Sequence, residues 1–174
     1  IIDEPFDACG QGATGDYNGW SLSKPANCVT VQTMSGERSG LLYGSAEGVS
    51  SPELGAVYEL DLRGYAKPGR LCWNEYASPG FSGTYRLDFH SIGGSAAWWV
   101  PIFDSQVPPM ALNDTNRDIC IDLESSFSDV IGTSGFGLGI SDQNSPGGGY
   151  MLLSNFRLEV SRPCDAADVL SLSQ

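Results

Sequence analysis

Apolar and polar residues alternate in short segments along most of the chain, and this alternation constrains the fold more than any other feature. In residues 84–90 (TYRLDFH) and 118–123 (DICIDL), every second side chain is apolar. Successive side chains of a strand point to opposite faces, so a period of two is typical of a strand with one buried face. Outside the C-terminal tail, there is no long segment in which apolar residues keep the spacing of a helix. The sequence therefore predicts a chain built mainly from strands.

Turn signals rich in Gly, Pro, Asn and Asp separate these segments, among them "SIGG", "DQNSPGGG" and "TNRD" at residues 115–118. The predicted strands are residues 1–7, 27–34, 39–45, 55–63, 69–77, 83–91, 97–104, 118–124, 134–141 and 149–160. About ten short strands at this spacing predict an all-β fold, a two-sheet antiparallel sandwich. We expect one sandwich domain over residues 1–162 and a C-terminal tail or linker over residues 163–174.

The charge of the chain excludes some partners. The formal net charge is −12 and the sequence pI is about 4.2. Such a surface repels phosphate backbones, so we expect no binding to nucleic acid. No apolar run approaches the ~18–20 residues that cross a bilayer, so we expect no membrane insertion.

The five cysteines are dispersed, without the paired spacing of a zinc site. Dispersed cysteines in a glycine-rich β protein favour disulfides and therefore secretion, although buried free thiols in a cytosolic protein remain an alternative. Cys72 and Cys120 share the polar phase of their strands and are a candidate cross-strand disulfide. Cys9 with Cys28 would then close the loop that contains Trp20. Cys164 is the candidate for the unpaired thiol.

The two ends of the sequence resemble a known family. The opening "IIDEPFDACGQGATGDYNGWSLS" has an acidic strand with a Phe-Asp pair, followed by Gly19-Trp20, and the ending "GGGYMLLSNFRLEV" is a closing apolar strand. Both are similar to secreted jelly-roll modules of the galactose-binding-like superfamily, which includes carbohydrate-binding modules, MAM-type domains and bacterial surface adhesin domains. The resemblance implies a jelly-roll sandwich that is secreted or displayed at a cell surface. The sequence departs from the family pattern at Ser154-Asn155, where these modules usually have Asp-Asn.

Polar side chains share one phase in two of the predicted strands. If these strands are neighbours, one outer sheet face carries Asn74, Tyr76, Arg86, Asp88 and His90. Such side chains make paired hydrogen bonds to sugar hydroxyls, and aromatic rings stack on the apolar faces of sugars. The alternative is that Arg86 and Asp88 form a solvated surface pair beside an exposed histidine.

The aromatic candidates are four tryptophans. Trp98 and Trp99 point to opposite sides of an extended strand, so one of them is a further candidate for ligand binding. Trp20 and Trp73 are expected in the core.

Calcium is the metal that the resemblance implies. Related modules bind a structural ion where the first and last strands meet, and the matching positions here are Asp3, Asp7 and Asn155. Oxygen ligands of this kind suit Ca²⁺. A second candidate is the loop-like spacing of Asp114, Asn116 and Asp118, which lacks the glycine and distal glutamate of a calcium loop.

Catalytic motifs are absent from the sequence. It contains no G-x-S-x-G elbow and no H-E-x-x-H helix motif, and His90 has no evident nucleophile or acid as a partner. The sequence thus predicts a non-catalytic module that binds a carbohydrate or polysaccharide, within a longer chain of further domains. The alternatives are a protein-binding or cell-adhesion module of the same fold, and a small polysaccharide-active hydrolase or lyase.

Overall fold

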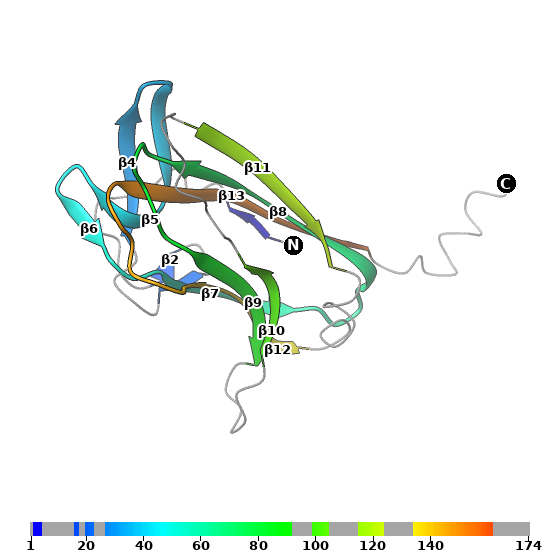
Figure 1. Ribbon diagram of the computed structural model, residues 1–174. Coiled ribbons are helices and arrows are strands. Elements are labelled where there is room, and N and C mark those ends of the chain that lie inside the picture. The colour runs from blue at the N-terminus through cyan, green and yellow to red at the C-terminus, as the bar shows by residue number, and fades with distance from the viewer. Residues whose placement is uncertain are drawn as a thin grey trace, which may run out of the picture.

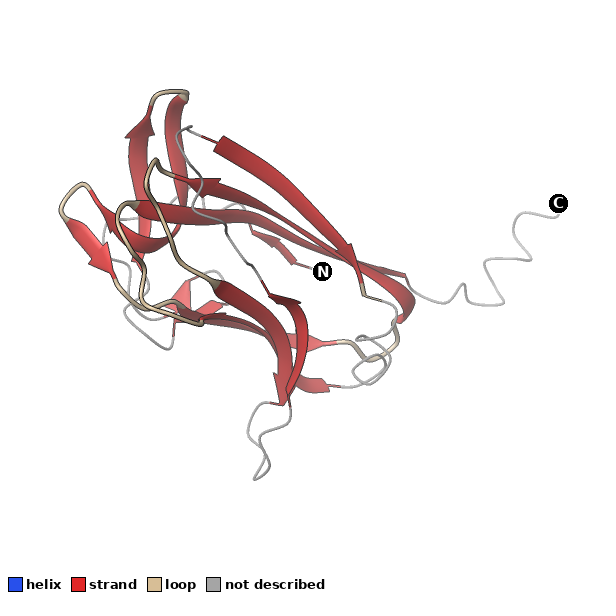
Figure 2. Cartoon of the chain, in the orientation of Figure 1, coloured by secondary structure: helices blue, strands red, loops and turns tan. Residues whose placement is uncertain are grey.

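A computed structural model describes residues 2–4, 16–17, 20–22, 27–91, 99–104, 115–123 and 134–161, in which thirteen strands form two antiparallel sheets facing each other (Figure 1). The described residues contain no helix (Figure 2), and so no helix that is long and apolar enough to cross a membrane. The seven-stranded sheet has the order β11-β8-β13-β5-β4, with β1 paired to β13 and β6 paired to β5. Its strands are β1 (Ile2–Glu4), β4 (Asn27–Thr33), β5 (Gly36–Ala46), β6 (Val49–Ser51), β8 (Ala66–Ala77), β11 (Thr115–Asp122) and β13 (Tyr150–Ser161).

The six-stranded sheet has the order β10-β9-β12-β7-β3-β2. Its strands are β2 (Asp16–Tyr17), β3 (Trp20–Leu22), β7 (Gly55–Asp61), β9 (Tyr85–Ser91), β10 (Trp99–Asp104) and β12 (Ser134–Asp142). The prediction of a two-sheet antiparallel sandwich is confirmed, and each of the ten predicted strands overlaps an observed one.

One predicted turn is wrong. The segment "TNRD" at residues 115–118 is the start of β11, which pairs with β8 from Thr115↔Ala77 to Asp122↔Arg70. Pairing with a central strand overrides the turn preference of Asn and Asp, because this preference is weaker than the hydrogen bonds and packing of a sheet.

The main core lies between the two sheets, and it contains the side chains that the alternation predicts to face inward. Leu71 and Trp73 from β8 meet Leu87 and Phe89 from β9, and all four are at most 1% exposed. Trp73 stacks on Phe156 of β13 with ring centroids 6.3 Å apart. The predicted core position of Trp73 is therefore confirmed, whereas the side chain of Trp20 lies outside the described residues.

A polar network bridges the sheets inside this core. Trp73 Nε1 donates a hydrogen bond to Tyr85 Oη (2.8 Å), and Tyr85 Oη donates to Glu75 Oε2 (2.7 Å). Arg117 Nη2 of β11 donates to the other oxygen, Glu75 Oε1. Glu75 is 1% exposed, so its carboxylate relies on these partners for the hydrogen bonds that water would otherwise supply. Burial, reinforced by Glu75, raises the pKa of Tyr85 well above its usual value.

The chain crosses from one sheet to the other between β8 and β9. β8 lies in the seven-stranded sheet and β9 in the six-stranded sheet, joined by residues 78–84. The prediction that the polar residues of these strands share one sheet face is therefore wrong. It assumed that consecutive strands are neighbours, whereas here consecutive strands lie in opposite sheets.

Candidate binding groove

A groove of about 360 Å³ lies on the outer face of the seven-stranded sheet, on the side away from the main core. This volume falls within the ~300–1,000 Å³ that is usual for small-ligand sites. Four strands supply its lining residues, which are Glu37, Arg38, Ser39, Tyr76, Asn116, Leu152, Ser154 and Asn155.

A β-bulge in β13 shapes one part of this lining. Ser154 pairs with Asn74 and Arg157 pairs with Cys72, so two residues of β13 oppose the single residue Trp73. Asn155 takes a left-handed backbone conformation with φ +52°, which Asn tolerates better than most residues. The bulge shifts the inward–outward alternation by one residue. Ser154 and Asn155 therefore both line the groove, while Phe156 returns to the core.

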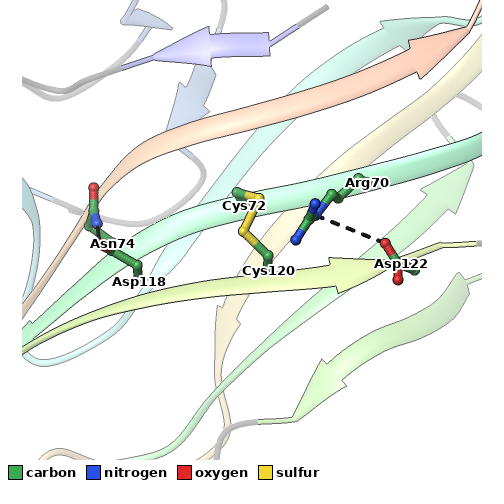
Figure 3. Close-up of a disulfide and its surroundings, with 6 residues drawn as sticks. All are labelled: Arg70, Cys72, Asn74, Asp118, Cys120 and Asp122. Carbon is green, nitrogen blue, oxygen red and sulfur yellow. Dashed lines mark hydrogen bonds and ion pairs between the residues drawn. A yellow bond between two sulfur atoms is a disulfide. The ribbon is translucent and has the colours of Figure 1, made fainter.

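The side-chain amides form a hydrogen-bonded chain across three strands. Asn155 Nδ2 of β13 donates to Asn74 Oδ1 of β8, and Asn74 Nδ2 donates to Asp118 Oδ1 of β11. Figure 3 shows Asn74 and Asp118 facing each other across the strand pair. Each bond restricts the orientation of an amide and leaves it a further donor or acceptor, because an amide can make more hydrogen bonds than the chain uses. The arrangement suits a ligand that carries both donors and acceptors.

The disulfide Cys72–Cys120 joins the same two strands (Figure 3). Its cysteines pair directly, two positions along from the Asp118↔Asn74 pair, so the disulfide helps to hold the edge strand β11 beside the groove. This confirms the cross-strand pairing predicted from their shared phase. Cys28 is also disulfide-bonded, and Cys9, its predicted partner, lies outside the described residues.

A second apolar cluster lies on the outer side of the seven-stranded sheet. Its buried members include Tyr76 and Leu152, which also line the groove, and Leu42 of β5. Tyr76 is 4% exposed. The guanidinium of Arg38 lies over its ring, with Cζ 5.1 Å from the ring centroid. Tyr76, which the sequence suggested as a binding residue, thus lines the groove, but its ring is covered by Arg38.

Arg38 and Glu37 reach the groove from the start of β5. This strand pairs with β13 only from Leu41 to Gly44, and its first residues pair with β4 alone. The strand passes close to β13 at Gly40, where a Cβ atom would lie 2.9 Å from the carbonyl oxygen of Leu153. The β4–β5 hairpin therefore forms a wall of the groove that is attached to the rest of the sheet at one end.

The other predicted binding residues lie elsewhere. Arg86 and Asp88 are on the outer face of the six-stranded sheet, where Arg86 Nε lies 3.7 Å from Asp88 Oδ2. They pair with each other, and their side chains are 29% and 12% exposed. They do not join Asn74 and Tyr76 in one surface. The side chains of His90 and Trp99, and all of Trp98, lie outside the described residues.

The predicted calcium ligands are only partly described. β1 pairs with β13, as expected for the first and last strands, and Asp3 lies opposite Arg157, two residues from Asn155. The side chain of Asp3 and all of Asp7 fall outside the described residues. The described side chains include no group of three His, Cys, Asp or Glu placed to hold a metal ion. Calcium at this position stays a prediction.

The second calcium candidate does not form a loop. Asn116 and Asp118 are alternate residues of β11, opposite Tyr76 and Asn74, and Asp118 accepts a hydrogen bond from Asn74. Both side chains face the outer side of the sheet as part of a regular strand, and Asp114 lies outside the described residues. The loop-like spacing was therefore misleading, because alternate residues of any strand share a face.

Sequence reasoning missed five of the eight groove-lining residues. Glu37, Arg38 and Ser39 stand in a segment predicted as turn and strand end, Leu152 was expected only as part of the closing strand, and Ser154 was noted only as a departure from the family pattern. Their spacing carries no signal, because the bulge and the path of the hairpin decide which side chains meet. Asn116 and Asn155, by contrast, were candidates for metal binding and are found in the groove.

Comparison with known proteins identifies the fold. No protein-family model matches the chain, and no curated protein matches its sequence. Among solved structures, the K2 cleaved adhesin domain of Lys-gingipain is similar, with 14% identity and a TM-score of 0.59 over 91% of this chain and 97% of that one. The CBM22-1 xylan-binding domain of Xyn10C from Paenibacillus barcinonensis gives 13% identity and a TM-score of 0.55 over 94% and 95%. The K1 cleaved adhesin domain of Lys-gingipain from Porphyromonas gingivalis W83 gives 15% and 0.53 over 93% and 98%. The chain therefore has the jelly-roll sandwich fold of these carbohydrate-binding and adhesin domains, as its sequence predicted.

Proposed function

We propose that the domain is a non-catalytic module that binds a neutral polysaccharide in the groove on its seven-stranded sheet. The observation that carries the proposal is the lining of the groove, in which amides and hydroxyls from three strands stand above an apolar floor. Sugars present hydroxyls that both donate and accept, together with apolar C–H faces, and this lining complements both. Carbohydrate-binding modules of the same fold support the proposal by analogy of fold.

The charge of the chain favours a neutral ligand. The formal net charge is −12, and Arg38 is the one cation among the described side chains that line the groove, beside the carboxylate of Glu37. A polyanionic chain would approach against the overall field of the protein, whereas a neutral chain pays no such penalty. We therefore propose a ligand recognised mainly by hydrogen bonds and apolar contacts.

The same analogy supports a proposal about the cellular setting of the domain. A secreted or surface location accords with the Cys72–Cys120 disulfide, because disulfides persist in oxidising compartments. The CBM22-1 module of Xyn10B is found in one chain with a GH10 module, and the present domain matches 28% of that two-module chain. We propose a similar place for this domain, beside other domains of a longer chain.

An adhesion module that binds a protein partner is the rival function. Such a module needs an exposed apolar patch. Among the residues whose side chains the structure describes, Met34 is the one large hydrophobic residue that is exposed. The described surface thus favours the polysaccharide.

Affinity electrophoresis tests the proposal with gels containing soluble xylan, mixed-linkage β-glucan, agarose or, as an anionic comparison, polygalacturonate. The wild-type protein should be retarded by at least one of the neutral polymers. Asn116→Ala should weaken that binding about tenfold through the loss of a hydrogen bond to the ligand. Asp122→Ala is the matched control, because Asp122 lies on the same strand and face but outside the groove. Retardation by none of these polymers, or equal loss in both variants, would refute the proposal.

A further inference from the structure

We infer that Arg38 is a built-in cap on Tyr76, and that a ligand must displace this cap to reach the floor of the groove. The inference rests on the proposed function, since it assigns a regulatory element to the same groove. Tyr76 lies on the outer face of the sheet, where it packs in the second apolar cluster and is 4% exposed. The planar guanidinium of Arg38 occupies the space over the ring, at 5.1 Å from its centroid.

The hydrogen bonds of Arg38 indicate that the cap is weakly held. Arg38 Nη2 donates to Ser35 Oγ (3.1 Å) in the turn of the hairpin. Arg38 Nε is buried and has no hydrogen-bond partner among the described residues. An unmade hydrogen bond of a buried donor opposes the attraction between the cation and the ring, so the two effects partly cancel. Displacing Arg38 would return its Nε to water, which restores the missing hydrogen bond.

The backbone that carries Arg38 is suited to such a displacement. Arg38 pairs with Val31 of β4 and has no partner on β13, because β5 and β13 pair only from Leu41 onward. The hairpin can therefore shift without breaking the central β13–β8 and β13–β5 pairing. Tyr76, in contrast, stands on a central strand that pairs on both sides, with β11 and β13. A mobile cap over a fixed ring is the arrangement expected of a site that opens when ligand binds.

The ligand that displaces Arg38 would use the same face of Tyr76. A guanidinium and a pyranose both lie flat on an aromatic ring, so they compete for one position. Binding then requires the open form, and the apparent affinity is reduced by the fraction of molecules that are open. Removing the guanidinium should therefore tighten binding, which is the opposite of what a direct contact between Arg38 and the ligand would give.

Two measurements on Arg38→Ala test the cap. The first is nitration of Tyr76 by tetranitromethane without any ligand, followed by peptide mass spectrometry. We expect Tyr76 to react about fivefold faster in Arg38→Ala than in the wild type. The cap exchanges rapidly between a closed and an open form, and only the open fraction of the wild-type molecules exposes Tyr76 to the reagent. The second is affinity for soluble xylan, which should rise about three- to tenfold. Arg63→Ala is the matched control, because Arg63 is exposed and lies outside the groove.

The outcomes separate the cap from the proposed function. Faster nitration together with tighter binding in Arg38→Ala, with Arg63→Ala unchanged, supports the cap. Equal or weaker binding in Arg38→Ala overturns the cap and leaves the polysaccharide-binding function standing. Unchanged nitration also overturns the cap. If neither the wild type nor Arg38→Ala binds soluble xylan, and the neutral panel also fails, the cap and the proposed function fall together.

Discussion

Replacement of Tyr85 by Phe should destabilise the sandwich far more than the loss of one oxygen atom suggests. Tyr85 Oη accepts a hydrogen bond from Trp73 Nε1 and donates one to Glu75 Oε2. All three residues are at most 1% exposed, so no water replaces the missing hydroxyl. Phe has nearly the same shape as Tyr, which leaves the packing of the core intact.

The magnitude follows from the two atoms that lose their hydrogen bond to the hydroxyl, Trp73 Nε1 and Glu75 Oε2. A buried N–H without an acceptor costs about 1–3 kcal/mol, and a hydrogen bond to a charged group contributes about 1.5–3 kcal/mol. Glu75 retains its bond from Arg117, which limits the second cost. We expect the free energy of unfolding to fall by about 3 kcal/mol, and Tm to fall by about 6–12 °C for a domain of this size.

Urea denaturation of four proteins measures this effect, namely the wild type, Tyr85→Phe, Glu75→Gln and the double variant. The coupling between the two positions should be at least about 1 kcal/mol, because the side chains share a buried hydrogen bond. A loss below about 1 kcal/mol in Tyr85→Phe, with no coupling to Glu75→Gln, would show that the hydroxyl does not bridge the two sheets.

Three further predictions concern pH, the disulfide and the bulge. Desolvation, with Asp142, raises the pKa of Tyr43 to about 12, and burial raises the pKa of Tyr85 well above its usual value. In the unfolded chain these tyrosines ionise near pH 10, whereas in the folded protein they keep their protons, so the free energy of unfolding should fall as the pH rises from 10 to 12. Urea titrations at several pH values measure this fall, which should be smaller in Tyr43→Phe. Removal of the disulfide by Cys72→Ala with Cys120→Ala should cost about 2–4 kcal/mol in the same assay, and no change would show that it does not constrain the unfolded chain. Asn155→Val should lower Tm, because a β-branched residue is strained at φ +52°, whereas Asn155→Gly should cost less; equal losses would contradict a left-handed bulge.

The parts of the fold that depend on local alternation could be predicted from the sequence. The inward phase of Leu71, Trp73, Leu87 and Phe89 follows from side-chain direction alone, because a strand turns successive residues to opposite faces. The disulfide between Cys72 and Cys120 follows from the same phase once β8 and β11 are neighbours.

Features that depend on non-local pairing could not be predicted. Arg86 is separated from Asn74 because β9 belongs to the second sheet, and no local pattern in either strand predicts this change of sheet. Glu75 stands at an inward position that an apolar residue would normally fill, and it is tolerated because Arg117 and Tyr85 bind it from two other strands. The bulge at Asn155 likewise depends on the pairing of β13 with β8.

The most direct test of the account is an NMR titration of the wild-type protein with soluble xylan oligosaccharides, or with whichever neutral polymer retards it most. Side-chain amide signals from Asn74, Asn116 and Asn155 should shift on binding, since these residues stand in or beside the groove on the seven-stranded sheet. Signals from Arg86 and Asp88, on the outer face of the other sheet, should remain in place. Shifts confined to the Arg86–Asp88 face would contradict the account, as would the absence of any shift at saturating oligosaccharide.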